Sequence, residues 1–324
     1  MDNDVWRNAY YRSAIKEVSS KLQLHNWFEI GPGASGTLSK MVLEADSRNE
    51  LLAIEAVESS AKLVTKKLKE FSSRFRVLWG LAGKMCEPED AVPAEALVSE
   101  ILGHFGSSEG YVSILNSLGK YKFLKHVKTA IPLWFGTRMV PVDLTGMKNA
   151  RLGCIGPKAV HFWKLRFADI ELVPSGLHGT MEMYNSMEEL KRSSQSKLGQ
   201  ARRFTCEWGI ECESPRPFHG FGFYLVYSDD DKGPWQTSDA STRHASTSWS
   251  NPFVPIQGGE FLVQNGDRVR CRVSCFVEQD EPSYEYHVTV TRQTEKVLDE
   301  TIRIGYNDLI PVLYTLRQAK KALK

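Results

Sequence analysis

The chain has 324 residues and a formal net charge of +2, and 42% of its residues are hydrophobic and 25% charged. These values are ordinary for a globular protein that is long enough for two domains. The charge is too small to indicate nucleic-acid binding, so no direct nucleic-acid partner is expected. No apolar run reaches the roughly 18 residues of a membrane span, and the first residues do not form a signal peptide. We therefore expect a cytoplasmic protein without a membrane partner, with the nucleus as an open second location.

The six cysteines are scattered along the chain and form no Cys-x-x-Cys pair. Reduced, buried thiols are therefore expected instead of disulfides. The acidic residues discussed below have no cluster of His or Cys around them, so no metal is expected.

Apolar residues recur at helical spacing over residues 5–24, and Asp4 precedes them as a candidate N-cap. Arg7, Tyr10 and Tyr11 crowd the first turns of this predicted helix. Such residues usually pack or lie at the surface, and a functional role requires that they fold over a ligand.

A predicted strand over residues 27–30 leads into a glycine-rich turn, which a predicted helix over residues 37–43 follows. Gly31, Gly33 and Gly36 make this turn a Gly-x-Gly-x-x-Gly motif. Glycines let the backbone approach a ligand closely, and the start of the helix adds amide donors. The pattern is that of the beginning of a nucleotide-binding unit.

A second apolar run over residues 51–55 reads as a buried strand that ends in Glu55. A carboxylate at that position can accept hydrogen bonds from both ribose hydroxyls of an adenosine ligand. Together with the glycine turn it predicts an adenosine-containing cofactor, and the alternative is a relic that binds nothing. Glu29, just before the glycines, either anchors the loop or contacts the ligand.

A third short strand is predicted over residues 75–80, and Ala82 and Gly83 follow it. Their backbone amides could lie against the edge of an adenine base.

Glu100 and Glu109 bracket a loop that follows the apolar run 96–98, and we call residues 100–109 the acid loop. Open α/β sheets bind ligands at the carboxyl ends of their strands, and two acids without a metal suit a planar guanidinium. The alternative is a solvated loop that happens to carry two acids. His104 and Phe105 lie inside the loop, where packing or hydrogen bonding is favoured over catalysis or pocket lining.

The second half alternates apolar and polar residues in four stretches, which are 160–167, 221–227, 268–276 and 284–291. This pattern predicts an antiparallel module, either a barrel or a sandwich. Residues 180–195 interrupt it with helical spacing and predict a projecting arm that is rich in Met. Such a segment serves either as core filler or as a binding surface.

In this order the pieces resemble the protein arginine methyltransferases over nearly the whole chain. Glu100 and Glu109 look like that family's double-glutamate loop, and Glu29 to Gly36 look like its S-adenosyl-L-methionine motif. The resemblance implies a Rossmann-like class I methyltransferase domain, then an antiparallel β-barrel with a dimerisation arm, in a homodimer. The implied boundaries are a cofactor-lid helix over 1–24, a methyltransferase domain over 25–132, and a barrel over 133–324 with its arm at about 177–196.

The resemblance also implies roles for single residues. Glu100 and Glu109 are the implied catalytic pair. The implied cofactor-binding residues are Arg7, Tyr11, Glu29, Gly31, Gly33, Gly36, Glu55, Ala82 and Gly83. Tyr10, Ser248 and Trp249 are implied on the substrate side, where Ser248 replaces the histidine of the family's Thr-His-Trp loop. For Trp249, core packing in the barrel is an equal alternative.

The implied activity is methyl transfer from S-adenosyl-L-methionine to arginine guanidinium groups of proteins, with histones and RNA-binding proteins as candidate substrates. The substrate-loop and acid-loop residues are similar to the monomethylating (type III) branch, and this predicts monomethylation. One alternative is an inactive paralogue that regulates an active relative as its dimer partner. Another is a nicotinamide-dependent oxidoreductase, because the three glycines with Glu55 also meet the dinucleotide fingerprint; the predicted all-β second half disfavours it.

Overall fold

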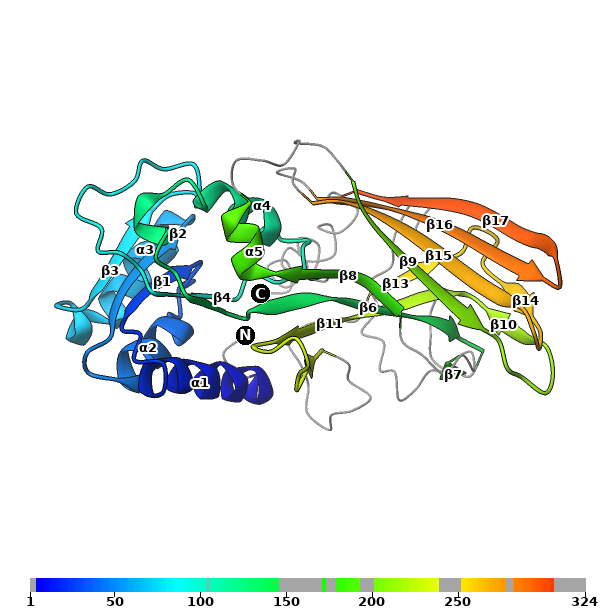
Figure 1. Cartoon of the computed structure of the whole chain (residues 1–324), viewed down its shortest axis with the longest axis horizontal. Coiled ribbons are helices and arrows are strands. Elements are labelled where there is room, and N and C mark those ends of the chain that lie inside the picture. The colour runs from blue at the N-terminus through cyan, green and yellow to red at the C-terminus, as the bar shows by residue number, and fades with distance from the viewer. Residues whose placement is uncertain are drawn as a thin grey trace, which may run out of the picture.

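The computed structural model describes residues 4–103, 105–145, 171–172, 179–192, 201–238, 252–277 and 282–305. These residues form an α/β part and an antiparallel β module that lie end to end, so the molecule is elongated (Figure 1). The predicted strand over 160–167 lies outside the described residues. No helix in the described ranges is long and apolar enough to cross a membrane.

The α/β part alternates strands and helices as the sequence predicts. Its elements are α1 (Val5–Ser20), β1 (Asn26–Ile30), α2 (Thr37–Ala45), β2 (Glu50–Glu55), α3 (Glu58–Lys67), β3 (Phe75–Trp79), β4 (Ala96–Ser99), α4 (Tyr111–Leu118) and β5 (Thr129–Ile131). Short 3₁₀ turns span Lys69–Phe71 and Lys122–Leu124.

The five strands of this part form one parallel sheet in the order β3-β2-β1-β4-β5. Ile30 at the end of β1 lies opposite Ile54 of β2 and opposite Ser99 of β4. The carboxyl ends of all five strands therefore meet at one edge. The direction of the strand order reverses between β1 and β4, which is where ligands bind in open α/β sheets.

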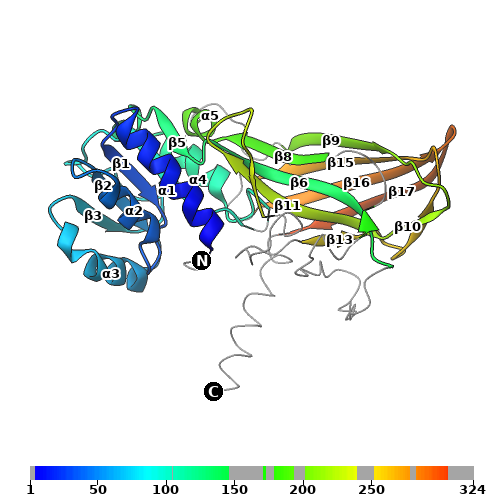
Figure 2. The ribbon, with the colours of Figure 1, turned by 90° about the horizontal axis from the view of Figure 1, so that it is seen from below.

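Helices cover both faces of the parallel sheet (Figure 2). Trp27 packs in one apolar cluster with Val42 of α2 and with residues of α1, whereas its neighbour Phe28 packs in another with Leu115 of α4. Strands buried on both faces need apolar residues at every position. This explains why their sequences read as continuous apolar runs.

The β module is antiparallel throughout its described residues. Its elements are β6 (Trp134–Asp143), β7 (Glu171–Leu172), β8 (Gly179–Asn185), α5 (Ser186–Lys191), β9 (Arg202–Gly209), β10 (Arg216–Phe218), β11 (Gly220–Ser228), β12 (Gln236–Thr237), β13 (Phe253–Pro255), β14 (Phe261–Val263), β15 (Arg268–Phe276), β16 (Ser283–Arg292) and β17 (Glu295–Ile304). One sheet runs β12-β11-β6-β7, with β8 also paired to β6 and β13 to β11. Another runs β17-β16-β15-β9, and β10 pairs with β14.

The strands of the module differ in how they are buried. Along β15 the buried Val269, Cys271 and Val273 alternate with exposed arginines, which is the period of two expected for a strand with one solvated face. In contrast, β11 is buried at every residue. Its Phe223 belongs to the same apolar cluster as Phe28 of the parallel sheet, so one continuous core joins the two parts.

The prediction of a helical arm over residues 180–195 is wrong for its first residues. They form β8 and pair antiparallel with β6. Met181 and Tyr184 of β8 are buried in the core, and this long-range pairing overrides the local helical spacing. A helix begins only after Asn185, whose side chain accepts hydrogen bonds from the amides of the first turn of α5. Within the predicted arm the structure describes only 179–192, and these residues lie against β6 and α4 of the same chain.

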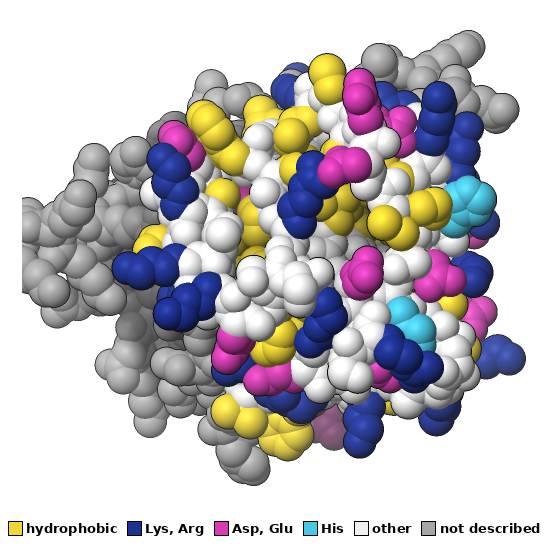
Figure 3. Space-filling view, turned by 90° about the vertical axis from the view of Figure 1, so that its left-hand side faces the viewer, with side chains coloured by type: hydrophobic (Ala, Val, Ile, Leu, Met, Phe, Trp, Pro, Cys, Tyr) yellow, Lys and Arg dark blue, Asp and Glu magenta, His cyan; other side chains and the backbone are white. Residues whose placement is uncertain are grey.

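The outer face of the α/β part carries Lys and Arg side chains interspersed with Asp and Glu (Figure 3). On this face the described residues form no area of a single sign of charge, in keeping with the small net charge. The cysteines described carry free thiols. Burial, which the sequence also predicts, holds for Cys206, Cys271 and Cys275 on the strands, whereas Cys212 is half-buried and Cys86 is exposed because both lie outside the strands.

Candidate functional site

The glycine loop leaves β1 at Gly31 and enters α2 at Gly36. Both residues have a positive φ, 71° and 63°, which side chains rarely adopt. A Cβ on Gly31 would approach Ile101 to 2.9 Å, and one on Gly36 would approach Val64 to 2.4 Å. Gly33 has a φ of 62°, but a Cβ there would meet no described atom within 4 Å. The ends of the loop are therefore packed tightly, while its middle borders open space.

Glu55 at the end of β2 holds the glycine loop in place. Its carboxylate accepts one hydrogen bond from the amide of Gly33 and one from the amide of Val57, each at 2.9 Å. A carboxylate offers about four lone-pair sites, so these bonds leave room for two further donors. The two hydroxyls of a ribose could supply these two donors. The free acceptor capacity of Glu55 is therefore compatible with an adenosine cofactor.

Glu29 lies one residue before the end of β1 and is 1% exposed. Its Oε2 accepts a hydrogen bond of 2.5 Å from Ser39 Oγ on α2. Burial raises the pKa of Glu29 to about 8, against the opposing effect of the Ser39 hydrogen bond. Because this bond ties β1 to α2 across the glycine loop, the geometry favours the anchor interpretation of Glu29 over direct contact with a ligand.

The substitution Glu29→Gln is expected to stabilise the protein at high pH. Between the usual carboxyl pKa of 4.5 and the raised value of about 8, the folded protein holds a proton that the unfolded chain loses. The wild type therefore loses stability as the pH rises through that window, whereas the variant does not. Urea unfolding at pH 9 should show a gain on the order of 3 kcal/mol, and at pH 4.5 a difference near zero. Glu44→Gln, at an exposed position of α2, is the control, and equal effects at both pH values would contradict the raised pKa.

Glu100 follows β4 and is fastened to α1. Its Oε2 lies 3.1 Å from Nη1 of Arg7, and the two side chains are 7% and 4% exposed. Asp4 caps α1, as predicted, by accepting a hydrogen bond of 3.1 Å from the amide of Arg7. Tyr11 Oη donates a hydrogen bond of 2.8 Å to the carbonyl of Ser99. The N-terminal helix is therefore locked onto the carboxyl end of β4.

The negative charge of Glu109 acts on the ionisation of Glu100. Burial raises the pKa of Glu100 to about 8, the positive charge of Arg7 opposes this, and the negative charge of Glu109 adds to it. Desolvation of its carboxyl raises the pKa of Glu109 as well, although the residue as a whole is exposed. The structure thus brings together the two acids that the sequence singles out.

The loop between the two acids is anchored in the β module. Phe105 is fully buried, and its ring centroid lies 5.1 Å from that of Phe223 and 5.0 Å from that of Tyr284. Phe105 therefore serves as a core anchor, which is the role that the sequence analysis favours for it. His104 lies outside the described residues.

Tyr10 connects α1 to the β module. Its hydroxyl donates a hydrogen bond to the carboxylate of Asp229, just beyond β11, and its ring centroid lies 4.9 Å from that of Tyr227 in an edge arrangement. The predicted lid helix thus rests on both parts of the molecule, and its N-terminal end lies at their junction (Figure 2). A role of Tyr10 on the substrate side stays a prediction.

Ala82 and Gly83 follow β3 at the same edge of the sheet as Glu55. Gly83 has a φ of 78°, and a Cβ there would come within 2.3 Å of Ser117 on α4. Its carbonyl accepts a hydrogen bond of 2.6 Å from Lys120 Nζ. The turn is therefore held against α4, at the edge where the predicted adenine contact belongs.

Ser248 and Trp249, the predicted substrate-side residues of the barrel, lie outside the described residues. Among the residues that are described, no group of His, Cys, Asp and Glu could hold a metal ion.

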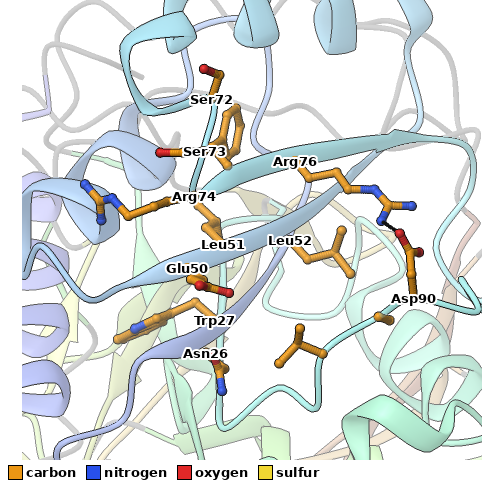
Figure 4. Close-up of a pocket in the computed structure, with 13 residues that line it drawn as sticks. Asn26, Trp27, Glu50, Leu51, Leu52, Ser72, Ser73, Arg74, Arg76 and Asp90 are labelled. Carbon is orange, nitrogen blue, oxygen red and sulfur yellow. Dashed lines mark hydrogen bonds and ion pairs between the residues drawn. The ribbon is translucent and has the colours of Figure 1, made fainter.

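A pocket at the opposite edge of the parallel sheet is unrelated to the acid loop (Figure 4). It is lined by the residues that begin β1, β2 and β3, which are Asn26, Glu50 and Phe75. An ion pair of 2.6 Å between Arg76 and Asp90 borders it. Because parallel strands have their amino ends there, the pocket lies away from the edge that carries the glycine loop and the acids.

Sequence reasoning missed a buried carboxylate, Glu182, which bonds to the acid loop from β8. It lies in the segment predicted as an arm, where an acid suggests a solvated surface. No local signal marks it as buried, because Met181 and Tyr184 flank it at helical spacing.

Taken together, the described residues form a Rossmann-like α/β domain followed by an antiparallel β module, as the sequence predicts. Among the described residues, the second half has no second parallel nucleotide-binding unit. The oxidoreductase alternative therefore lacks the architecture that it requires.

Known proteins share this architecture. One is protein arginine methyltransferase 10 of Arabidopsis thaliana, solved in an open conformation, with a TM-score of 0.72, 13% sequence identity, and coverage of 94% of this chain and 96% of that chain. Another is the enzyme–prozyme heterotetrameric complex of PRMT1 with AdoHcy from Trypanosoma brucei, with a TM-score of 0.69, 13% identity and the same coverages of 94% and 96%. No protein-family model and no curated protein sequence matches the chain. The chain therefore has the fold of the arginine methyltransferases.

Proposed function

We propose that the chain is a protein-arginine N-methyltransferase that uses S-adenosyl-L-methionine. The observation that carries this proposal is the pair Glu100 and Glu109, which flank one loop at the carboxyl edge of β4, where Arg7 holds Glu100 at 3.1 Å. The glycine loop and Glu55 at the ends of the neighbouring strands β1 and β2 support a methyl donor beside that pair.

Methylation of arginine requires a clamp, that is, groups that orient the guanidinium, more than it requires a base. Its pKa exceeds about 12, so the guanidinium arrives as a cation and must be oriented, not simply deprotonated. The arriving cation favours the ionised form of both acids, and the carboxylates of Glu100 and Glu109 that accept its N–H groups draw positive charge toward the nitrogens they hold. The remaining nitrogen is left richer in electrons and faces the donor. Such positioning alone can contribute on the order of 7–11 kcal/mol to lowering the barrier.

Arg7 orients one half of the clamp. It holds Oε2 of Glu100 at 3.1 Å, so we place the substrate guanidinium at Oε1. When bound, S-adenosyl-L-methionine supplies an electrophilic methyl group on its sulfonium sulfur. Glu55 would accept its ribose hydroxyls, and Ala82 and Gly83 would border its adenine. After transfer, Glu109 or water removes the proton from the methylated nitrogen.

The first test is an assay with isotope-labelled S-adenosyl-L-methionine and an arginine-rich peptide. Label is expected in the peptide, and a matched peptide with Lys in place of every Arg should remain unlabelled. Absence of label in the arginine peptide, with the cofactor shown by calorimetry to bind, would contradict the proposed activity.

We further propose monomethylation, on the resemblance to the type III branch. Mass spectrometry of the product should detect monomethylarginine as the end product at long reaction times. Accumulation of dimethylarginine would contradict this part of the proposal alone.

The second candidate is an inactive paralogue that regulates an active relative as its dimer partner. Two observations favour it, since Arg7 already occupies one oxygen of Glu100 and Ser248 replaces the family's loop histidine. Calorimetric titration separates the candidates, because the inactive partner should show no binding of S-adenosyl-L-methionine. The two retained glutamates, the three glycines and Glu55 support activity.

We also propose a homodimer that acts on arginine-containing proteins, such as histones and RNA-binding proteins, in the cytoplasm and also in the nucleus. The resemblance supports the dimer, and the PRMT1 protein of T. brucei forms a heterotetrameric complex. Sedimentation of the purified chain at micromolar concentration tests this, and a single monomer species would contradict it.

A further inference from the structure

A buried glutamate of the β module faces the acid loop. Glu182 on β8 is fully buried, and its carboxylate accepts four hydrogen bonds from three residues. Oε1 accepts from the amide of Ser107 at 3.1 Å and from Thr137 Oγ1 at 2.9 Å. Oε2 accepts from Ser107 Oγ at 2.5 Å and from Tyr184 Oη at 3.0 Å. Half of these bonds come from one residue of the acid loop.

The directions of these bonds fit a carboxylate. Thr137 Oγ1 accepts the amide of Gly106 at 2.8 Å, so the single proton of this hydroxyl is left for Glu182. If Ser107 Oγ likewise donates to Glu182, it can accept from Tyr284 Oη, which lies 2.8 Å away. Every donor then has one acceptor, and the network closes without a proton on Glu182.

The same stretch of the loop approaches β6 at backbone distance. A Cβ on Gly106 would lie 3.0 Å from the backbone of Gly136, and a Cβ on Gly136 would lie 2.2 Å from the carbonyl of Glu182. At these two glycines the loop, β6 and β8 therefore approach each other with no room for a side chain.

Ser107 is also joined to the catalytic end of the loop. Its carbonyl accepts a hydrogen bond of 3.0 Å from the amide of Gly110, which caps α4. Glu109 lies between these two residues, and the peptide group that follows it is fixed by a bond that leads through Ser107 back to Glu182.

We propose that Glu182 is a positioning residue that sets where Glu109 stands opposite Glu100. The catalytic part of this inference rests on the proposed methyl transfer. Stability alone does not account for a carboxylate here. Moving a charge out of water costs desolvation free energy that an apolar side chain of similar volume would not cost. What the charge provides is one acceptor group that fixes a backbone amide and three hydroxyls in a single arrangement.

The test compares Glu182→Gln and Tyr284→Phe with Val290→Ala in the full-length chain. A glutamine offers one oxygen and an amide, so it cannot accept all four bonds. Tyr284→Phe removes only the outer hydroxyl and serves where Glu182→Gln fails to fold. Val290 is buried in the same core but lies six residues further along β16 than Tyr284, so its truncation destabilises the module away from the loop.

For Glu182→Gln we expect kcat with an arginine peptide to fall about 10- to 100-fold, because misplacement of a catalytic group by about 1 Å can cost 100-fold. The KM for the peptide should rise, and the dissociation constant for S-adenosyl-L-methionine should change less than about threefold, since the glycine loop makes no bond to Glu182. Tyr284→Phe should lower kcat by a smaller factor. Val290→Ala should lower the melting temperature and leave kcat within about twofold.

Hydrogen exchange provides a readout that does not depend on activity. Residues 105–110 should exchange at least about tenfold faster in Glu182→Gln, while residues 29–45 should be unchanged. A Glu182→Gln variant with wild-type kcat, or a kcat loss matched by Val290→Ala at equal loss of melting temperature, would overturn the proposal. If the wild type transfers no methyl group, the proposed function fails, and the exchange result then decides whether Glu182 holds the loop.

Discussion

Glu109→Gln is expected to lower kcat for methyl transfer about 100- to 1,000-fold and to leave the dissociation constant for S-adenosyl-L-methionine within about threefold. The carboxylate is needed to hold a guanidinium cation, and a neutral amide presents its own donors to the N–H groups it should accept. The cofactor, in contrast, is expected at the glycine loop and Glu55, which Glu109 does not contact. Single-turnover rates with an arginine peptide, together with calorimetry of cofactor binding, measure both quantities.

Glu109 is a cleaner target than Glu100, because Glu100→Gln also removes the buried partner of Arg7. Glu95→Gln is the matched control. Glu95 precedes β4 at the opposite end from Glu100, where it pairs with Lys128 at 3.0 Å. Its replacement should leave the rate unchanged. Near wild-type activity in Glu109→Gln would rule out the clamp. Loss of cofactor binding would show that Glu109 serves the cofactor site and not the arginine site.

Arg7→Met is expected to destabilise the protein, and more so at high pH. Removing one partner of a buried ion pair leaves an uncompensated charge, at a cost of about 3 kcal/mol. At pH 7 the unpaired Glu100 can keep a proton, so the cost should be closer to about 1 kcal/mol for the lost hydrogen bond.

The sign of this pH dependence follows from the raised pKa of Glu100. In the wild type the folded protein loses stability as the pH rises from 4.5, the usual carboxyl value, to about 8, and then no further, because Glu100 is ionised in both states. Without Arg7 the pKa rises beyond 8, so the variant continues to lose stability where the wild type does not. The difference between the two should therefore grow between pH 8 and pH 9.5 in urea unfolding.

The double variant Arg7→Met with Glu100→Gln provides the control, because it has no charge left to bury. It should be more stable than Arg7→Met at pH 9.5, and together with Glu100→Gln and the wild type it completes the cycle that measures the coupling of the pair. A loss of stability in Arg7→Met that is the same at pH 7 and pH 9.5 would contradict the raised pKa of Glu100.

The α/β part could be predicted closely from local patterns. The N-cap Asp4, the Gly-x-Gly-x-x-Gly turn and the acid that ends β2 each depend on residues within a few positions of one another. Apolar runs bounded by turns identified β1 to β4 for the same reason. Beyond Pro132 the local signal weakened, and β6, which carries Gly136 and Thr137, was not anticipated as a strand.

The segment 179–185 shows why local spacing can fail. Its Met and Tyr residues suit a helix face by spacing alone, yet antiparallel pairing with β6 decides their structure. Pairing between distant strands is a tertiary property, and strand preference depends on the surface that a residue packs against. The same error hid Glu182, because an acid in a projecting arm has no reason to be buried.

The sequence by itself determined which residues meet at the carboxyl edge of the parallel sheet: a glycine turn, the acid that ends β2 and two glutamates. Only the tertiary structure decided how those glutamates are held. Arg7 reaches Glu100 across 93 residues of chain, and Glu182 reaches Ser107 across 75. Both contacts bury a charge that is tolerable only with its partners in place, and no short pattern in the sequence records which distant residue supplies them.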